Sequence, residues 1–158
     1  MMALTGRANL SKKTSISQAR SKARRCALQA VYQWQVGGAE IGEVEAQFLA
    51  EQDLGQADVA YFSELLRSIP AHVAELDAHL TPFLDRPVVE LDPVELAILR
   101  IGVCELAYQP QIPFRVIINE AVELAKVFGA EQSHRYINGV MDKVARELRR
   151  AELKMNTR

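Results

Sequence analysis

Four cationic side chains stand close together early in the chain, at Arg20, Lys22, Arg24 and Arg25. An exposed helix ordinarily mixes both signs of charge, because opposite charges at positions i and i+4 attract each other and like charges repel. Here no acidic residue lies near the four cations in the sequence. Such a cluster attracts anions, phosphate groups among them. The pattern therefore predicts an anionic partner.

The charges are segregated along the whole chain, although the formal net charge is only −1. Residues 1–39 hold seven Lys or Arg and no Asp or Glu, whereas residues 40–105 hold three against fourteen. Residues 106–158 are mildly basic, with nine against six. Segregated charge gives each segment a field that steers oppositely charged partners. We expect the basic start to meet an anionic partner and the acidic middle to meet a cationic one.

Motifs for catalysis and for metal binding are weak in this sequence. It has no Gly-rich phosphate loop after a strand, no GxSxG sequence and no pair of metal ligands at i and i+4. His72 and His79 lie seven residues apart with two acids between them, but no convincing third ligand accompanies them. The sequence therefore predicts neither an enzyme nor a metal or cofactor site.

The cationic residues must be positioned by helices, because apolar residues recur at helical spacing almost throughout the chain. One apolar face of the first predicted helix holds Ala23, Ala27, Ala30, Val31 and Trp34. The opposite face carries Arg24, Arg25, Gln29 and Tyr32. The pair Gly37-Gly38 should end this helix. Similar stripes predict further helices at about residues 40–53, 57–70 and 69–83.

The second half of the chain predicts three more helices. Asp92 as N-cap and Pro93 at the first position begin a helix that is apolar almost all round. The next stripe should end at Gly129, in a left-handed conformation. Helical spacing in the last segment runs straight through Asn138-Gly139, so we expect a helix in which Gly139 permits close packing.

These elements predict an all-α fold of two packed helical bundles, each of about three helices. We expect residues 1–18 to form a flexible basic arm, because the segment is polar, small and basic. Residues 19–158 should form a single helical domain, with subdomains at about 19–86 and 87–158.

The sequence also bears on the cellular compartment. No apolar run approaches the roughly 18 residues of a membrane span, and the start lacks the apolar core of a secretory signal. Cys26 and Cys104 lie far apart within apolar helical patterns, which favours small buried residues over a disulfide. We expect a cytoplasmic protein with no membrane partner.

Several segments resemble the NusB family of bacterial transcription antitermination factors. They are ARRCALQAVYQWQ, VEAQFLAEQD, YFSELL, LDPVELAILRIGVCEL and VIINEAVELAKVFGAEQSHRYINGVMDKV, in this order and at family-like spacing. The resemblance covers roughly residues 20–148. It implies the all-helical NusB fold and a role in the complex that, with other Nus factors, keeps RNA polymerase elongating through ribosomal RNA operons. NusB-like proteins bind the boxA element of nascent RNA together with NusE, a small-subunit ribosomal protein.

The resemblance also implies two RNA contact regions. The first is an Arg-rich helix start with an aromatic residue beyond it, and it falls on Arg20, Lys22, Arg24, Arg25 and Tyr32. The second is a turn and helix start, and it falls on Phe128, Gln132, Ser133, Arg135 and Tyr136, with Lys143 at its rim. Cations along a phosphate path and rings for base stacking are what single-stranded RNA binding requires. Ser21 stands where relatives commonly have another Arg, and Gln132 stands where they often have an acid. We therefore expect the RNA affinity to differ from that of the relatives.

The same resemblance places NusE near Glu90 and Glu95, where an acidic segment suits a basic ribosomal protein. Two other classes stay open at this point. A NusB-like domain also occurs fused to a ribosomal RNA methyltransferase, although 158 residues leave no room for that enzyme. Short basic helices also fit a helix-turn-helix DNA regulator, which would prefer duplex to single-stranded nucleic acid. The antitermination factor is the function that we expect.

Overall fold

The computed structural model describes the backbone of residues 2–51 and 54–156 and the side chains of residues 16–51 and 54–154. Within these ranges the chain is helical and has no strand. The α-helices are α1 (Met2–Gly37), α2 (Ile41–Glu51), α3 (Val59–Ala71), α4 (Val73–Leu80), α5 (Pro93–Tyr108), α6 (Phe114–Phe128), α7 (Ser133–Leu148) and α8 (Arg150–Asn156). Two short 3-10 turns, η1 (Thr81–Phe83) and η2 (Val88–Glu90), lie between α4 and α5. The predicted all-α class is confirmed.

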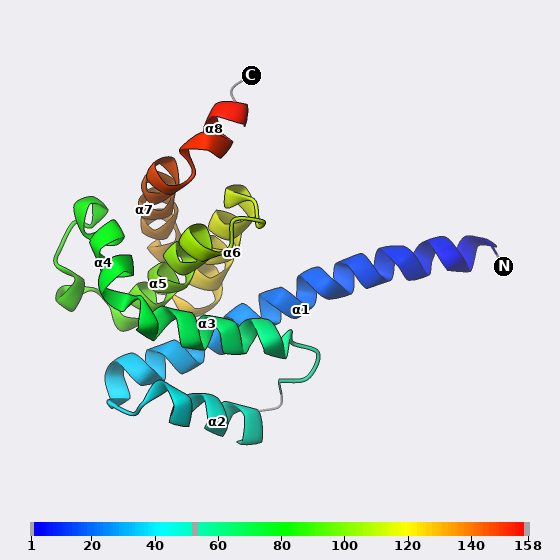
Figure 1. The fold of residues 1–158 in the computed structure, drawn as a ribbon, viewed down its shortest axis with the longest axis horizontal. Helices are drawn as coiled ribbons and strands as arrows, with labels where there is room; N and C mark the ends of the chain where they lie inside the picture. The colour runs from blue at the N-terminus through cyan, green and yellow to red at the C-terminus, as the bar shows by residue number, and fades with distance from the viewer. Residues whose placement is uncertain (1, 52–53, 157–158) are drawn as a thin grey trace.

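The helices form two groups that share one core. α2 and α3 lie along the C-terminal half of α1, whereas α4, α6 and α7 pack against α5 (Figure 1). α1 also packs directly against α5, so the apolar side chains of both groups form one continuous cluster. α5 is buried along most of its length, as its apolar sequence predicts. The limits of the two predicted subdomains stay predictions.

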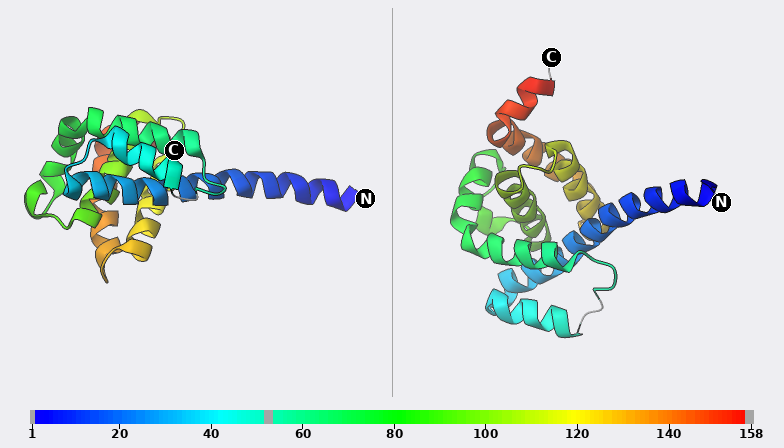
Figure 2. Two further views of the ribbon diagram at one scale, coloured as in Figure 1. Left: turned by 90° about the horizontal axis from the view of Figure 1, so that it is seen from below. Right: turned by 45° about the vertical axis from the view of Figure 1, so that its right-hand side comes forward.

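The N-terminal part of α1 projects away from the packed helices in every view (Figures 1 and 2). The sequence predicts a flexible arm over residues 1–18, whereas the structure continues α1 as one helix back to Met2. Residues 2–20 contain one glycine and no proline, so nothing in this segment stops a helix. The helical backbone was not predicted, and the flexibility of the segment in solution stays a prediction.

Two helix boundaries follow directly from local chemistry. The Asp92 carboxylate accepts a hydrogen bond from the backbone N–H of Glu95 at 3.2 Å, and Pro93 occupies the first helical position. After α1, Gly38 adopts a left-handed conformation with φ 72°, which a residue without a Cβ reaches at little cost. Both predicted boundaries are confirmed.

α6 ends at Phe128, directly before Gly129 as predicted, but the conformation predicted for Gly129 and the role predicted for Gly139 are wrong. Gly129 has φ −85° and is not left-handed; a Cβ there would come within 2.7 Å of a carbonyl oxygen in the last turn of α6. The left-handed residue of this turn is Gln132, with φ 74°. Gly139 has open space around it and permits no close packing, although α7 runs straight through it. The close approach occurs at Gly102, where a Cβ would overlap the side chain of Met141.

Candidate nucleic-acid interface

Arg24 belongs to the core and not to the surface of α1. Its side chain is 3% exposed, and its Nε lies 2.7 Å from Oε1 of Glu105 on α5. The hydroxyl of Tyr61 on α3 donates a hydrogen bond to the same carboxylate oxygen. Pairing and hydrogen bonding are what make two buried charges tolerable. The prediction that Arg24 lies on the exposed face of the helix is therefore wrong, and its predicted contact with RNA stays a prediction.

Burial shifts the pKa of each member of this network, and it raises the pKa of Glu105 against the opposing charge of Arg24. Burial alone would lower the pKa of Arg24, but the charges of Glu105, Tyr61 and Glu120 and the hydrogen bond to Glu105 together outweigh burial and raise the pKa. Burial, followed by the charge of Glu105, raises the pKa of the Tyr61 hydroxyl far above its ordinary value. The arginine thus stays charged and the tyrosine stays a hydrogen-bond donor.

Two further acids reach the basic turn of α1 from other parts of the chain. The Ser21 hydroxyl donates a hydrogen bond of 2.7 Å to Oε1 of Glu120 on α6. Nε of Arg20 lies 3.8 Å from Oδ2 of Asp58, which also caps the N-terminus of α3. The Arg20 guanidinium sits over the ring of Tyr61, 4.8 Å from its centroid. The fold therefore supplies the acids that the sequence of α1 lacks.

Lys22 and Arg25 are the two cations of the cluster that form no ion pair within the described part of the chain. Arg25 is exposed and Lys22 is half-buried. They share one face of α1 with Ser21, Gln29 and Tyr32, because these positions recur at helical spacing. We call these five residues the α1 stripe, and from Lys22 to Tyr32 it extends about 15 Å along the helix.

The structure brings the two predicted RNA contact regions together at one end of the α1 stripe. Tyr32 from α1 and Phe128 from the end of α6 line a groove of about 190 Å³, which Leu28 and Val94 also border. Tyr32 is 40% exposed and Phe128 is 37% exposed. Exposed rings beside a cationic path offer surfaces on which bases can stack. We call this hollow the Tyr32–Phe128 groove.

The other residues of the second region are divided between surface and interior. Gln132 and Arg135 are exposed at the start of α7. Ser133 is only 6% exposed, and its Oγ has no hydrogen-bond partner among the described residues. Ser133 is thus buried and not at the surface, and its predicted contact with RNA stays a prediction. Lys143 is exposed, about 15 Å further along α7.

Tyr136 joins α7 to the connection between α4 and α5. Its hydroxyl accepts a hydrogen bond from the Asp85 backbone N–H at 3.2 Å and donates one to Asp85 Oδ1 at 3.0 Å. The ring is partly buried against the core. This side chain therefore has a structural role that the sequence did not indicate, and its predicted contact with RNA stays a prediction.

Sequence reasoning missed the residues that hold the α1 stripe in place, chiefly Tyr61, Glu105 and Glu120. For Glu105 a signal existed: a carboxylate within a helix that is otherwise almost entirely apolar requires a buried cation or donor. For Tyr61 and Glu120 no local signal existed, because only the tertiary fold brings their helices to α1.

The two acids predicted to bind a partner lie beside an apolar hollow. Glu90 is exposed at the end of η2, and Glu95 is half-buried in the first turn of α5. The hollow measures about 440 Å³ and is lined chiefly by Trp34, Val36, Val88, Val89 and Leu96. Partial burial, followed by the charge of Asp92, raises the pKa of Glu95. A cationic partner would relieve this unfavourable environment of the carboxylate.

Comparison with known proteins identifies the family. The sequence model of the NusB family matches residues 21–146. The chain belongs to the NusB family. Among its relatives, the transcription antitermination protein NusB of Nitrosococcus oceani is 55% identical over 139 residues, which cover 88% of this chain and 93% of the relative. The NusB protein of Alcanivorax borkumensis is 56% identical over 138 residues, covering 87% and 92%.

Solved NusB structures share the fold. NusB of T. maritima superposes with a TM-score of 0.72 at 26% identity, covering 85% of this chain and 96% of that one. A crystal structure of the antitermination factors NusB and NusE in complex with double-stranded RNA gives a TM-score of 0.74 at 27% identity, covering 82% and 98%. The NusB family match begins at residue 21, so the projecting part of α1 lies outside it.

Two structural findings concern other kinds of site. In the part of the chain that the structure describes, no helix is both long and apolar enough to cross a membrane. Nor do three His, Cys, Asp or Glu side chains gather there in a way that could hold a metal ion. His72 instead stacks on the ring of Tyr108, with 4.3 Å between the ring centroids.

Proposed function

We propose that this protein is an RNA-binding transcription antitermination factor. Together with NusE it binds the boxA element of nascent ribosomal RNA operon transcripts and, with other Nus factors, promotes processive elongation by RNA polymerase. It acts in the cytoplasm by binding and not by catalysis. Membership of the NusB family and the likeness to a NusB structure that contains NusE and RNA support this proposal.

The observation that carries the proposal is the α1 stripe and the groove in which it ends. Phosphates would bind Lys22 and Arg25, the two cations of the cluster that form no ion pair with any described residue, and bases would stack on Tyr32 and Phe128. Because the buried network fixes α1 against three other helices, the path is formed before RNA arrives, which lowers the ordering cost of binding. The remaining proposed contacts are Arg20, Gln132, Arg135, Tyr136 and Lys143.

NusE would occupy the surface around Glu90 and Glu95. The apolar hollow beside these acids includes Val89, which is 90% exposed. Burying this apolar side chain against a partner would be favourable. Interfaces combine such an apolar centre with charged residues at the rim that set the association rate and the register. A basic ribosomal protein fits this combination of acids and apolar surface.

A competition assay tests the proposed function. Labelled boxA RNA is bound to the protein, with and without NusE, and is competed with unlabelled boxA RNA, scrambled RNA of the same composition and random duplex DNA. We expect boxA RNA to compete best and NusE to tighten its binding. Equal competition by scrambled RNA would contradict recognition of boxA, and stronger competition by duplex DNA would favour a DNA regulator.

A further inference from the structure

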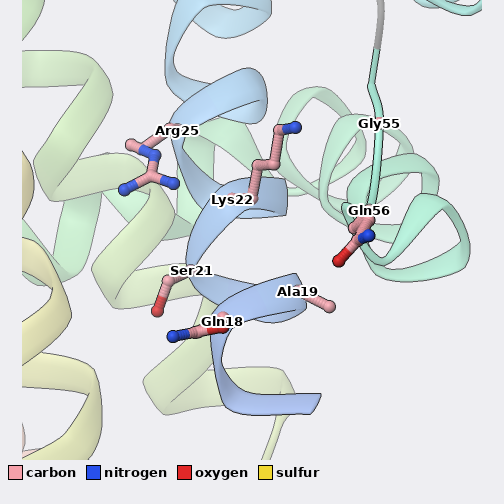
Figure 3. Close-up of a pocket in the computed structure, with 7 residues that line it drawn as sticks. All are labelled: Gln18, Ala19, Ser21, Lys22, Arg25, Gly55 and Gln56. Carbon is pink, nitrogen blue, oxygen red and sulfur yellow. The ribbon is translucent and has the colours of Figure 1, made fainter. Parts of the chain in front are cut away.

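Another hollow lies at the end of the α1 stripe away from the Tyr32–Phe128 groove. It measures about 580 Å³ and lies between α1 and the loop that joins α2 to α3 (Figure 3). Its lining includes Gln18, Ser21, Lys22, Arg25 and Gln56. The described lining thus holds both unpaired cations of the stripe and no acid. The function proposed above makes no use of the loop.

The described part of the loop is held against α1 at its C-terminal end. The backbone N–H of Asp58 donates a hydrogen bond of 2.9 Å to the carbonyl of Ala19 on α1. Gly55 turns the chain with φ 54°, a conformation that a residue with a Cβ rarely adopts. Gln56 lies between these two points and is exposed. In Figure 3, Lys22 extends on the side of α1 that faces the loop with Gln56.

Size, charge and hydrogen-bonding capacity together suit a nucleotide. Pockets for small ligands commonly measure about 300 to 1,000 Å³, and this hollow falls within that range. An ammonium group supplies a point charge for a phosphate. A side-chain amide both donates and accepts, so it can pair with the edge of an unstacked base. The hollow also continues a path that already presents cations and rings to a single strand.

We propose that this hollow binds one nucleotide next to the boxA element, with its phosphate at Lys22 and its base edge at the amide of Gln56. The proposal rests on the proposed RNA-binding function. It extends that function by assigning Gly55 and Gln56, in the described part of the loop between α2 and α3, to the RNA interface. It also makes Gln56 a residue that determines which nucleotide is preferred beside boxA.

The test compares three RNAs: boxA alone, boxA with four added nucleotides on the 5′ side, and boxA with four on the 3′ side. Wild-type protein should bind one extended RNA about fivefold more tightly than boxA alone, the effect of one or two hydrogen bonds. Gln56→Ala should abolish that gain and leave binding to boxA alone unchanged. Gln56→Glu should bind the extended RNA more weakly still, because a carboxylate cannot donate to the base edge and adds a negative charge beside the RNA.

The exposed glutamine Gln47 on α2 provides the matched control, since it lies outside the lining of the hollow. Gln47→Ala and Gln47→Glu should keep the full gain, and all four variants should melt at the wild-type temperature. As a direct readout, 4-thiouridine within the added nucleotides should cross-link to the peptide that contains Gln56. Cross-linking elsewhere, no gain for either extended RNA, or a gain that Gln56→Ala retains would overturn the proposal.

Failure of the underlying function gives a different result. Wild-type protein that binds boxA RNA no better than scrambled RNA would overturn both the proposed function and this inference. A normal preference for boxA without any effect of added nucleotides would overturn this inference alone.

Discussion

Arg24 and Glu105 face each other where α1 meets α5, with Nε and Oε1 2.7 Å apart, although 81 residues separate them in the sequence. Their side chains are 3% and 1% exposed. The pair lies directly beneath the helix face that carries Lys22 and Arg25. Of four neighbouring cations, one therefore holds the fold together while two others remain free to bind, and substitutions should separate these roles.

Arg24→Ala should lower the free energy of unfolding by about 3 to 5 kcal/mol, because it leaves the Glu105 carboxylate buried without a partner. Urea denaturation measures the change. Replacing both partners, as Arg24→Met with Glu105→Met, should recover a large part of the loss, since neither charge then remains buried. Wild-type stability of Arg24→Ala would mean that the ion pair is absent in solution.

The double variant Lys22→Ala and Arg25→Ala should alter RNA binding and leave the fold unchanged. Losing two phosphate contacts to single-stranded RNA should flatten the slope of log affinity against log salt by about 1.4. Stability should change by about 0.5 kcal/mol or less per substitution. Arg67→Ala is the control, because this cation on α3 is 78% exposed and lies outside the stripe. An unaltered salt slope in the double variant would remove these cations from the interface.

Tyr32→Ala and Phe128→Ala should each weaken RNA binding by about 1 to 3 kcal/mol if bases stack in their groove. Tyr136→Phe offers the contrast, since it keeps the ring and removes the hydroxyl that bonds to Asp85. That variant should lose about 1 kcal/mol of stability and keep its RNA affinity. Fluorescence titration and thermal melting measure the two quantities. Loss of stability alone in the first two variants would make their rings structural.

Glu95→Lys should separate the two partners. Truncating one partner of a buried charge pair in an interface costs roughly 2 to 5 kcal/mol, and reversing the charge of Glu95 should reduce NusE affinity by more than that. Binding of boxA RNA by the protein alone should change by no more than about twofold. Glu147→Lys, on the exposed side of α7, is the matched control. Calorimetric titration of each partner decides the matter. Equal loss of both partners would mean that Glu95 supports the fold, because it also lies in the capped first turn of α5.

Glu152 should make stability depend on pH in the acidic range. Partial burial acts to raise its pKa, but the hydrogen bond from the Phe114 N–H and the charge of Arg149 outweigh burial and lower it. A lowered pKa in the folded state means that the carboxylate stabilises the fold above its unfolded-state pKa, and that this contribution is lost as pH falls through the folded-state value. The stability difference between wild type and Glu152→Gln, measured in urea, should therefore shrink from about pH 6 to about pH 3. A stability difference that stays constant between these pH values would mean that protonation of Glu152 is not coupled to folding.

The helices were predictable because their signals are local. Apolar spacing, the Asp92-Pro93 start and the glycine after α1 act within a few residues, and the structure confirms them. The burial of Arg24 was also accessible in principle. It lies four residues before Leu28 and seven before Val31, both buried, so helical geometry places it on the inner side of α1. Its charge made it look like a surface residue, whereas the partner that permits burial lies on α5.

The interface was predictable only in part. The resemblance to NusB assigned Tyr32 and Phe128 to two separate RNA contact regions, and the structure places both in one groove. Nothing in the spacing of the sequence indicates this proximity, since it depends on how α1 and α6 pack around α5. The loop with Gln56 had no signal at all, because a lone polar residue in a loop is unremarkable until the hollow beside it is known.

The long separation between Arg24 and Glu105 has a consequence for synthesis on the ribosome. α1 leaves the exit tunnel first, and at about 5 to 20 residues per second the partner carboxylate is made about 4 to 16 s later. During that interval Arg24 lacks the carboxylate that pairs with it in the folded protein, and neither Phe128 nor the α6 side of the groove exists. A prematurely ended chain would therefore bind RNA by charge alone, without discrimination. Only the completed domain withdraws Arg24 from solvent and presents the two remaining cations beside a groove for bases.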